Sequence, residues 1–215
     1  MKILVTGSSS GIGKAIAQKF LVEGHSVVGI DKLPATIKRK NYTHVVADVF
    51  YDKLPEIEGV EVLVNNAGVQ NSGNDIDVNL KGTIAVTEKY AIQPAIKSVV
   101  FVASASAETG SEFPEYVASK GGMVSYMKNV ALRIAKYGAT SNSLSPGGVL
   151  TPLNQHIIDD PELWRQVMDE TPLRKWASAE EIAEWAYFVA VVNKSMTAQN
   201  LLIDNGEAAR ANFIW

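Results

Sequence analysis

The first two dozen residues contain the feature that most restricts the fold. Ile3-Leu4-Val5 is a short apolar run, and the small-residue stretch at 6–13 (Thr-Gly-Ser-Ser-Ser-Gly-Ile-Gly) follows it directly. The next segment places apolar side chains at helical spacing, namely Ala15, Ile16, Ala17, Phe20 and Leu21. This order predicts a buried strand, a glycine turn and a helix. Glycines let the backbone approach a pyrophosphate closely, and a helix N-terminus attracts phosphate charge, so the pattern favours a nucleotide-binding turn.

Apolar strand-like runs and amphipathic segments alternate along the rest of the chain. We expect further strands at 27–30, 44–47, 60–64, 98–103, 140–145 and 200–203. Asp160-Pro161 has the pattern of a helix start, and Ser178 with Glu181 has the spacing of a capping box that opens a helix to about Val192. This alternation predicts an α/β fold, a doubly wound parallel sheet of about seven strands, with residues 1–215 forming a single domain.

Composition narrows the chemistry. Apolar residues make up 47% and charged residues 20% of the chain, and a net charge of −3 gives no basic field for nucleic acid. The absence of cysteine excludes disulfides, thiol catalysis and thiolate metal sites. The three histidines are scattered singly, which disfavours a zinc mechanism and predicts no metal site. The N-terminus has no signal-peptide pattern and no apolar run reaches membrane-spanning length, so we expect a cytoplasmic protein.

Asp31 stands directly after the second predicted strand, about twenty residues beyond the glycine turn. A carboxylate in this place accepts hydrogen bonds from the ribose hydroxyls of adenosine and repels a 2′-phosphate. The sequence therefore predicts that NAD(H) is favoured over NADP(H). Lys32 is adjacent and would soften that preference.

Several short motifs follow in order. They include Asn65-Asn66-Ala67-Gly68, then Asn79 and Ser104, and then Tyr116-Val117-Ala118-Ser119-Lys120. With residues 6–13 they resemble the short-chain dehydrogenase/reductase family over essentially the whole chain. Further similar stretches are Asp48-Val49, Pro146-Gly147, Thr151-Pro152, Pro172-Leu173-Arg174, Glu181-Ile182-Ala183 and Asp204-Asn205-Gly206. The resemblance implies a Rossmann-type fold and an NAD(P)-dependent oxidoreductase.

Tyr116 and Lys120 are four residues apart, so they share one face of a helix. A free tyrosine has a pKa of about 10, which is too high for an efficient base at neutral pH. An ammonium about 4 Å away favours the phenolate by roughly 4 kcal/mol at an effective dielectric of about 20. That energy corresponds to roughly three pKa units. Tyr116 is therefore the candidate general acid and base, and Ser104 would hold the substrate oxygen.

The resemblance assigns the remaining roles. Asn79 would complete a catalytic tetrad with Ser104, Tyr116 and Lys120 by relaying protons through water to Lys120. Ser106 competes with Ser104 for the serine role; Ser104 matches the family position, although its spacing to Tyr116 is one residue shorter than usual. The residues that the resemblance places around the cofactor are Gly7, Ser9, Ser10, Gly11, Ile12, Gly13, Asp31, Asp48, Val49, Asn66, Ala67, Gly68, Tyr116, Lys120, Pro146, Gly147, Val149 and Thr151.

One segment departs from the family. Only ten residues separate Gly68 from Asn79, fewer than in most members. We therefore expect a tight turn at 71–74 and a comparatively open substrate cleft. A helix is expected from about Asp75 to Tyr90.

These features predict an NAD(H)-dependent enzyme that interconverts a secondary alcohol and a carbonyl, with a hydroxy- or keto-acyl compound, a steroid or a small ketone as substrate. An epimerase acting on nucleotide sugars is the first alternative, and the compact chain argues against its larger substrate domain. A cofactor-sensing binding protein without turnover is the second, and the Tyr116–Lys120 pair argues against it. We expect a homodimer or homotetramer formed by the 75–90 and Tyr116 helices. The apolar tail at 213–215 is a further candidate for that interface.

Overall fold

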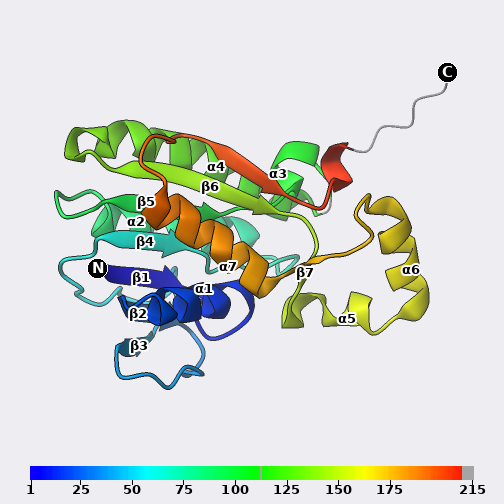
Figure 1. The fold of residues 1–215 in the computed structure, drawn as a ribbon, viewed down its shortest axis with the longest axis horizontal. Coiled ribbons are helices and arrows are strands. Elements are labelled where there is room, and N and C mark those ends of the chain that lie inside the picture. The colour runs from blue at the N-terminus through cyan, green and yellow to red at the C-terminus, as the bar shows by residue number, and fades with distance from the viewer. Residues whose placement is uncertain (112, 210–215) are drawn as a thin grey trace.

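One parallel sheet organises the molecule. The computed structural model describes residues 1–111 and 113–209, and within them seven strands pair in the order β3-β2-β1-β4-β5-β6-β9 (Figure 1). Their bounds are β1 Lys2–Thr6, β2 Ser26–Asp31, β3 Tyr42–Val46, β4 Val62–Asn65, β5 Ser98–Val102, β6 Thr140–Pro146 and β9 Asn200–Ile203. A separate short pair joins β7 (Val149–Leu150) to β8 (Ala177–Ser178). The predicted doubly wound α/β fold is confirmed.

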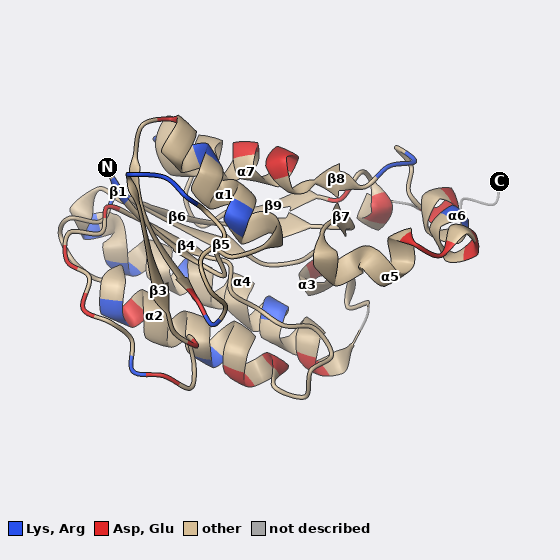
Figure 2. Ribbon diagram, turned by 90° about the horizontal axis from the view of Figure 1, so that it is seen from below, with Lys and Arg blue, Asp and Glu red and all other residues tan. Residues whose placement is uncertain are grey.

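Helices cover both faces of the sheet. Helices α1 (Gly11–Val22) and α7 (Ala179–Tyr187) lie on one face, while α2 (Thr83–Tyr90) and α4 (Pro114–Ile134) lie on the other (Figure 2). Each face has its own apolar core, and every residue of β4 and β5 is buried between the two. Burial on both sides explains why these strands are nearly continuous apolar runs.

The carboxyl ends of the strands form the edge of the sheet at which a ligand site is expected. The strand order reverses between β1 and β4, and ligands of open α/β sheets bind at such a point. Beyond this edge lie the short helices α5 (Gln155–Ile158) and α6 (Pro161–Glu170) (Figure 1). The predicted caps are present: Asp160 accepts hydrogen bonds from two α6 amides, and Ser178 and Glu181 form the capping box of α7.

The expected helix from about Asp75 to Tyr90 has two parts. A π-helix, η1 (Ile76–Gly82), precedes α2, and π-helical turns occur frequently at functional sites. The expected tight turn before it is present, because the buried Asp75 carboxylate accepts hydrogen bonds from the amides of Asn71 and Ser72 at 2.9 and 2.8 Å.

The remaining short helical turns connect these elements. They are α3 (Ser106–Thr109), η2 (Ala135–Tyr137), η3 (Pro152–Asn154), η4 (Phe188–Val192) and η5 (Glu207–Ala209). The helix predicted to run to about Val192 is thus α7 continued by η4. None of the described helices combines the length and apolar character needed to cross a bilayer.

Candidate active site

The glycine turn is built by close backbone packing. Gly7 and Gly11 have left-handed φ angles of +68° and +50°, which favour glycine. A Cβ on Gly13 would lie 2.0 Å from the Gly7 carbonyl oxygen, so only glycine lets α1 start this close to the turn. The Asn66 side-chain amide donates to the carbonyls of Thr6 and Gly7 at 3.0 and 3.2 Å, which ties the end of β4 to the turn.

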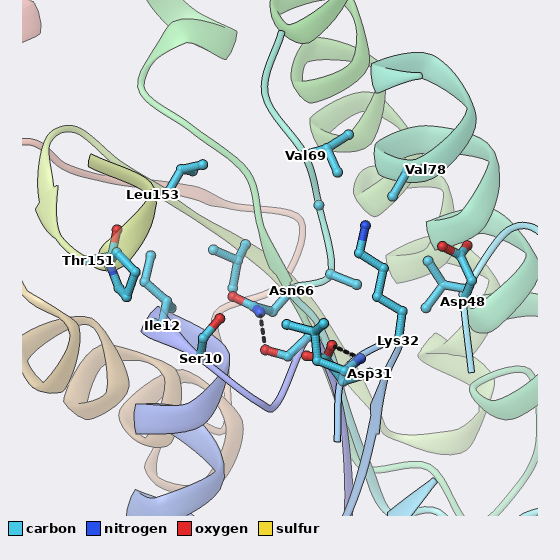
Figure 3. A pocket seen from close by; sticks show the side chains of 18 of the residues that line it. Ser10, Ile12, Asp31, Lys32, Asp48, Asn66, Val69, Val78, Thr151 and Leu153 are labelled. Atoms are coloured by element: carbon cyan, nitrogen blue, oxygen red, sulfur yellow. Dashed lines mark hydrogen bonds between the residues drawn. The ribbon is translucent and has the colours of Figure 1, made fainter. Parts of the chain in front are cut away.

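A cavity of about 300 Å³ opens above this turn (Figure 3). It is lined by thirteen of the residues predicted to surround a cofactor, namely Gly7, Ser10, Gly11, Ile12, Asp31, Asp48, Val49, Asn66, Ala67, Gly68, Tyr116, Lys120 and Thr151. We call it the cofactor cavity. Ser9 and Gly13 instead belong to the frame of the turn, and Pro146, Gly147 and Val149 line a neighbouring cavity.

The cofactor cavity also has lining residues that were not predicted. They are Leu33, Ala47, Val69, Val78, Val102, Ala103, Pro152 and Leu153, together with Lys32, whose effect was anticipated. Ala47 and Val69 are next in sequence to the predicted residues Asp48 and Gly68. The expectation that residues just beyond strand ends line the site was therefore sufficient to find them. Val78 reaches the cavity from the π-helix, for which the sequence has no readable signal.

Asp31 is fixed at one end of the cofactor cavity. Its two carboxylate oxygens accept hydrogen bonds from the amides of Ser9 and Leu33, each at 2.9 Å. An ionised carboxylate has about four acceptor positions, so it keeps acceptors for ribose hydroxyls. Lys32 extends along the cavity toward Val78 (Figure 3), so one positive and one negative side chain line the same cavity.

A chain of hydrogen bonds supports the turn from behind, and we call it the β3 strut. The Ser8 and Tyr42 hydroxyls share a hydrogen bond of 3.0 Å, Tyr42 Oη and His44 Nδ1 share one of 2.9 Å, and His44 Nε2 lies 2.9 Å from the Leu33 carbonyl. A Cβ on Gly29 would be 2.2 Å from the Tyr42 hydroxyl, so glycine makes room for the chain. Burial raises the pKa of Tyr42, which keeps its phenol protonated at neutral pH.

Tyr116 and Lys120 lie one turn apart on α4 and line the cofactor cavity together. The Lys120 side chain is buried, and its Nζ donates to the Val102 carbonyl at 3.0 Å. The same Nζ lies 5.6 Å from the centre of the Tyr116 ring. The Lys120 ammonium thus lies beside the Tyr116 ring, and the carbonyl at the end of β5 holds it in place. Its effect on the Tyr116 phenol stays a prediction.

Asn79 is fully buried beneath this pair. Its Oδ1 accepts from the Val69 amide at 2.7 Å, and its Nδ2 donates to the Val69 carbonyl at 2.9 Å and to Ser119 Oγ at 3.0 Å. Both N–H donors are thus used in fastening residue 69 to α4. A Cβ on Gly68 would lie 3.1 Å from Asn79 Oδ1 and 3.6 Å from Lys120 Nζ, so Gly68 keeps the space between them open.

A second cavity of about 1010 Å³ adjoins the first, and we call it the substrate cavity. The two share Ile12, Ala103, Tyr116, Thr151 and Leu153, so the Tyr116 side chain lies at their junction. Ser104 and Ser106 both line the substrate cavity, as do Pro146, Gly147, Val149 and the turn residues Gln70 and Asn71.

The far wall of the substrate cavity comes from the segments after β6. Two carboxylates, Glu170 and Glu207, line this cavity. None of the described residues that line it is lysine or arginine. Glu207 Oε1 accepts from the Thr171 hydroxyl at 2.9 Å, which orients the carboxylate. No group of three His, Cys, Asp or Glu side chains suited to a metal ion occurs within residues 1–111 and 113–209.

Comparisons with known proteins agree with this geometry. A family model described as Enoyl-(Acyl carrier protein) reductase matches residues 7–207. Glucose 1-dehydrogenase from Gluconobacter oxydans is 29% identical and aligns with 99% of this chain and 93% of its own. A structure with bound NADP, from an Agrobacterium tumefaciens protein proposed to be a 2-deoxy-d-gluconate 3-dehydrogenase, is 25% identical, has a TM-score of 0.83 and covers 97% of this chain and 96% of its own.

The fold is also shared with 4-hydroxyisoleucine dehydrogenase complexed with NADH, at a TM-score of 0.88, 23% identity, and 98% and 99% coverage of this and the other chain. The family match includes every lining residue of the two cavities except Ala208. The protein therefore belongs to the short-chain dehydrogenase/reductase family and is an NAD(P)-dependent oxidoreductase that acts on CH–OH groups.

Proposed function

We propose that the protein interconverts a secondary alcohol and a carbonyl compound, with Tyr116 as the general acid and base. The observation that carries this proposal is the position of Tyr116 at the junction of the two cavities, one helical turn from the buried Lys120. The glycine turn and the Asp31 end of the cofactor cavity fit a dinucleotide. When bound, NAD(P)(H) would supply or accept the hydride.

Each catalytic side chain has a distinct part in this proposal. Tyr116 gives its phenolic proton to the substrate oxygen in reduction and takes it back in oxidation. The Lys120 ammonium favours the phenolate electrostatically and is held in place by the Val102 carbonyl. Ser104 binds the substrate oxygen. For Asn79, the proposed proton relay through water is limited to its remaining Oδ1 lone pair or its backbone, because its amide hydrogens are already donated.

We propose that NAD(H) is favoured over NADP(H). The Asp31 carboxylate lies in the cofactor cavity, where its charge would repel a 2′-phosphate and its free lone pairs would accept from ribose hydroxyls. Lys32 also lines this cavity and would offset part of the repulsion. Asp31 is fixed by two backbone amides, whereas the Lys32 side chain is exposed, so we expect the carboxylate to dominate.

The substrate is proposed to be uncharged and to carry polar groups. An anionic substrate would meet the Glu207 carboxylate, and the described lining residues include no lysine or arginine to attract it. Polar side chains that line the same cavity, including Gln166 and His156, suit hydroxyl or carbonyl groups. This favours a neutral hydroxylated or ketone substrate over a carboxylate or a phosphorylated compound.

The proposal of a homodimer or homotetramer rests on the outer faces of α2 and α4. Arg133 on α4 reaches Glu88 on α2 in a two-pronged ion pair, with NH2–Oε2 at 2.7 Å, and Tyr126 also donates to Glu88. The two helices therefore form one firm surface, as a self-complementary interface requires. The apolar tail at 213–215 lies outside the described residues. Light scattering at micromolar concentration tests this proposal, and a monomer with full turnover would contradict it.

The experiment that tests the function uses Tyr116→Phe. The unmodified protein is screened with neutral ketones, sugars and keto-acyl thioesters, following NADH oxidation beyond one equivalent. Tyr116→Phe should lower turnover at least a thousandfold, as expected for the loss of an acid-base group, while NADH affinity changes little. Tyr137→Phe, outside both cavities, is the matched control. Binding of NADH without turnover of any carbonyl would instead support a cofactor-sensing protein.

A further inference from the structure

Two serines meet in the turn that follows β5. Ser104 Oγ accepts one hydrogen bond from the Ser106 hydroxyl at 2.8 Å and another from the Ser106 backbone amide at 3.2 Å. Both side chains line the substrate cavity, yet Ser106 is only 3% exposed and Ser104 7%. Ser106 is therefore packed behind Ser104 as well as beside the cavity.

These two contacts determine what the Ser104 hydroxyl has left to offer. A serine hydroxyl has one proton to donate and two lone pairs that accept. Ser106 occupies both lone pairs of Ser104 Oγ. The remaining interaction is donation of the Ser104 proton, and the incoming hydrogen bonds strengthen that donor by polarising it. A ligand oxygen at Ser104 is therefore bound as an acceptor.

The turn that holds Ser106 is anchored at several points. The Ala103 amide donates to the Leu144 carbonyl at 2.7 Å, and the Ala105 amide donates to the Pro146 carbonyl at 2.8 Å. At the other end of α3, Glu108 accepts from the Asn200 side-chain amide of β9 at 2.7 Å. These contacts fix α3 against β6 and β9. The Ser106–Ser104 geometry is thus set by the sheet rather than by a free loop.

We propose that Ser106 is a positioning residue that makes Ser104 a dedicated hydrogen-bond donor to the substrate oxygen, leaving proton transfer to Tyr116 alone. The inference rests on the proposed function. In reduction, bound NAD(P)H would supply the hydride to the carbonyl carbon, the carbonyl oxygen takes the phenolic proton of Tyr116, and Ser104 keeps its own proton. In oxidation the alcohol proton returns to the Tyr116 phenolate, because Ser104 has no lone pair free to accept it.

The test uses single and double variants with a carbonyl that the unmodified protein reduces. Ser104→Ala should lower kcat by about a hundredfold, as for a lost oxyanion donor. Ser106→Ala should lower kcat by about tenfold, the size of one hydrogen bond, with KM and NADH affinity nearly unchanged. Ser106→Thr keeps the hydroxyl and should restore most activity. Adding Ser106→Ala to Ser104→Ala should cost nothing further, because Ser106 acts through Ser104.

Three results would overturn the inference. They are an unaffected kcat in Ser106→Ala, additive losses in the double variant, and a larger loss from Ser106→Ala than from Ser104→Ala. The last result would make Ser106 the residue that touches substrate. If Ser106→Ala fails to fold, Ser106→Cys replaces it, since a thiol is a weak donor of similar size. Retained turnover in Tyr116→Phe would refute the proposed function instead, so the two failures are distinguishable.

Discussion

The two cavities are built in different ways although they share the Tyr116 side chain. The cofactor cavity is small and lies on backbone and short side chains at the ends of β1, β2, β3 and β4. The substrate cavity is more than three times larger, and its far wall consists of long side chains from α5, α6 and the segments around Trp176 and Glu207. The shape of the cofactor cavity follows from the geometry of the sheet. The shape of the substrate cavity depends on the side chains of the segments that follow β6.

This difference indicates that the two halves respond differently to substitution. At the glycine turn, backbone atoms fill the space that a side chain would need, and backbone moves only at high cost. In the substrate cavity, the equivalent close contact is with a side chain, the indole ring of Trp176, which lines the cavity. Substitutions at the glycine turn of the cofactor cavity should therefore abolish dinucleotide binding. Substitutions in the substrate cavity should instead alter which substrate is used.

The largest contrast is expected between Gly13→Ala and Gly148→Ala. A Cβ on Gly13 would lie 2.0 Å from the Gly7 carbonyl oxygen, and one on Gly148 would lie 1.9 Å from Trp176 Nε1. Overpacking costs of about 3 kcal/mol predict at least a hundredfold weaker NADH binding for Gly13→Ala. Gly148→Ala should lower kcat/KM by about ten- to a hundredfold and leave NADH affinity within about fivefold.

Fluorescence titration of NADH and steady-state kinetics measure both effects. Gly121→Ala is the control, because a Cβ there meets no atom within 4 Å and its helical position favours alanine. Equal losses of NADH affinity in Gly13→Ala and Gly148→Ala would show that the two cavities do not respond independently to substitution.

A smaller effect should follow from changing the charge at Asp31. Asp31→Asn keeps an acceptor for the Ser9 or Leu33 amide but removes the negative charge. We expect the ratio of NADPH to NADH affinity to rise about tenfold, since a screened charge pair of this kind is worth roughly 1–2 kcal/mol. Competition titrations with both dinucleotides measure the ratio. An unmodified protein that binds NADH and NADPH equally would show that Lys32 fully offsets Asp31, against the proposed preference.

The smallest effect is expected at the opposite end of the sheet, away from both cavities. Burial against Phe20 and Tyr187, and then the nearby N-terminal ammonium, lower the pKa of His25. The unfolded chain therefore binds a proton at a pH where the folded protein does not, so the stability contributed by His25 is present above about pH 6.5 and is lost as the pH falls below it.

His25→Phe tests this sign, because His25 Nε2 has no hydrogen-bond partner in the part of the chain that the structure describes. The fall in Tm between pH 7.5 and pH 5.5 should be smaller in the variant by a few °C at most, given about 2–4 °C per kcal/mol for a chain of this size. Kinetics at pH 7.5 should be unchanged. A steeper fall in the variant would reverse the assignment.

Most of the fold was predictable because its signals are local. The strand runs, the glycine turn and the caps at Asp160 and Ser178 each follow from a few neighbouring residues. For the seven strands of the main sheet only the ends differ, whereas the short β7–β8 pair was not predicted. The third strand, for example, starts at Tyr42 rather than His44. The π-helix at 76–82 was not predictable, since a helical apolar pattern does not distinguish the register of backbone hydrogen bonds.

Those residues of the candidate site that lie at strand ends were predictable from the sequence. Asp31 is the last residue of β2, Asp48 and Asn66 follow β3 and β4, and parallel strands bring their carboxyl ends together. The contact of Tyr42 with Ser8 and that of Thr171 with Glu207 join residues 34 and 36 positions apart, and no local pattern signals them. The dinucleotide contacts of the cavity residues stay predictions.

The β3 strut links the outermost strand of the sheet to the binding of the dinucleotide. Tyr42 and His44 reach Ser8 and Leu33 only while β3 is paired to β2. A ligand that requires this arrangement stabilises it by mass action, by about 2.7 kcal/mol at a concentration a hundred times its Kd. Edge strands are the part of a sheet most open to pairing with other chains. Dinucleotide concentration would therefore also set how often β3 separates from β2 and leaves the β2 edge open to other chains.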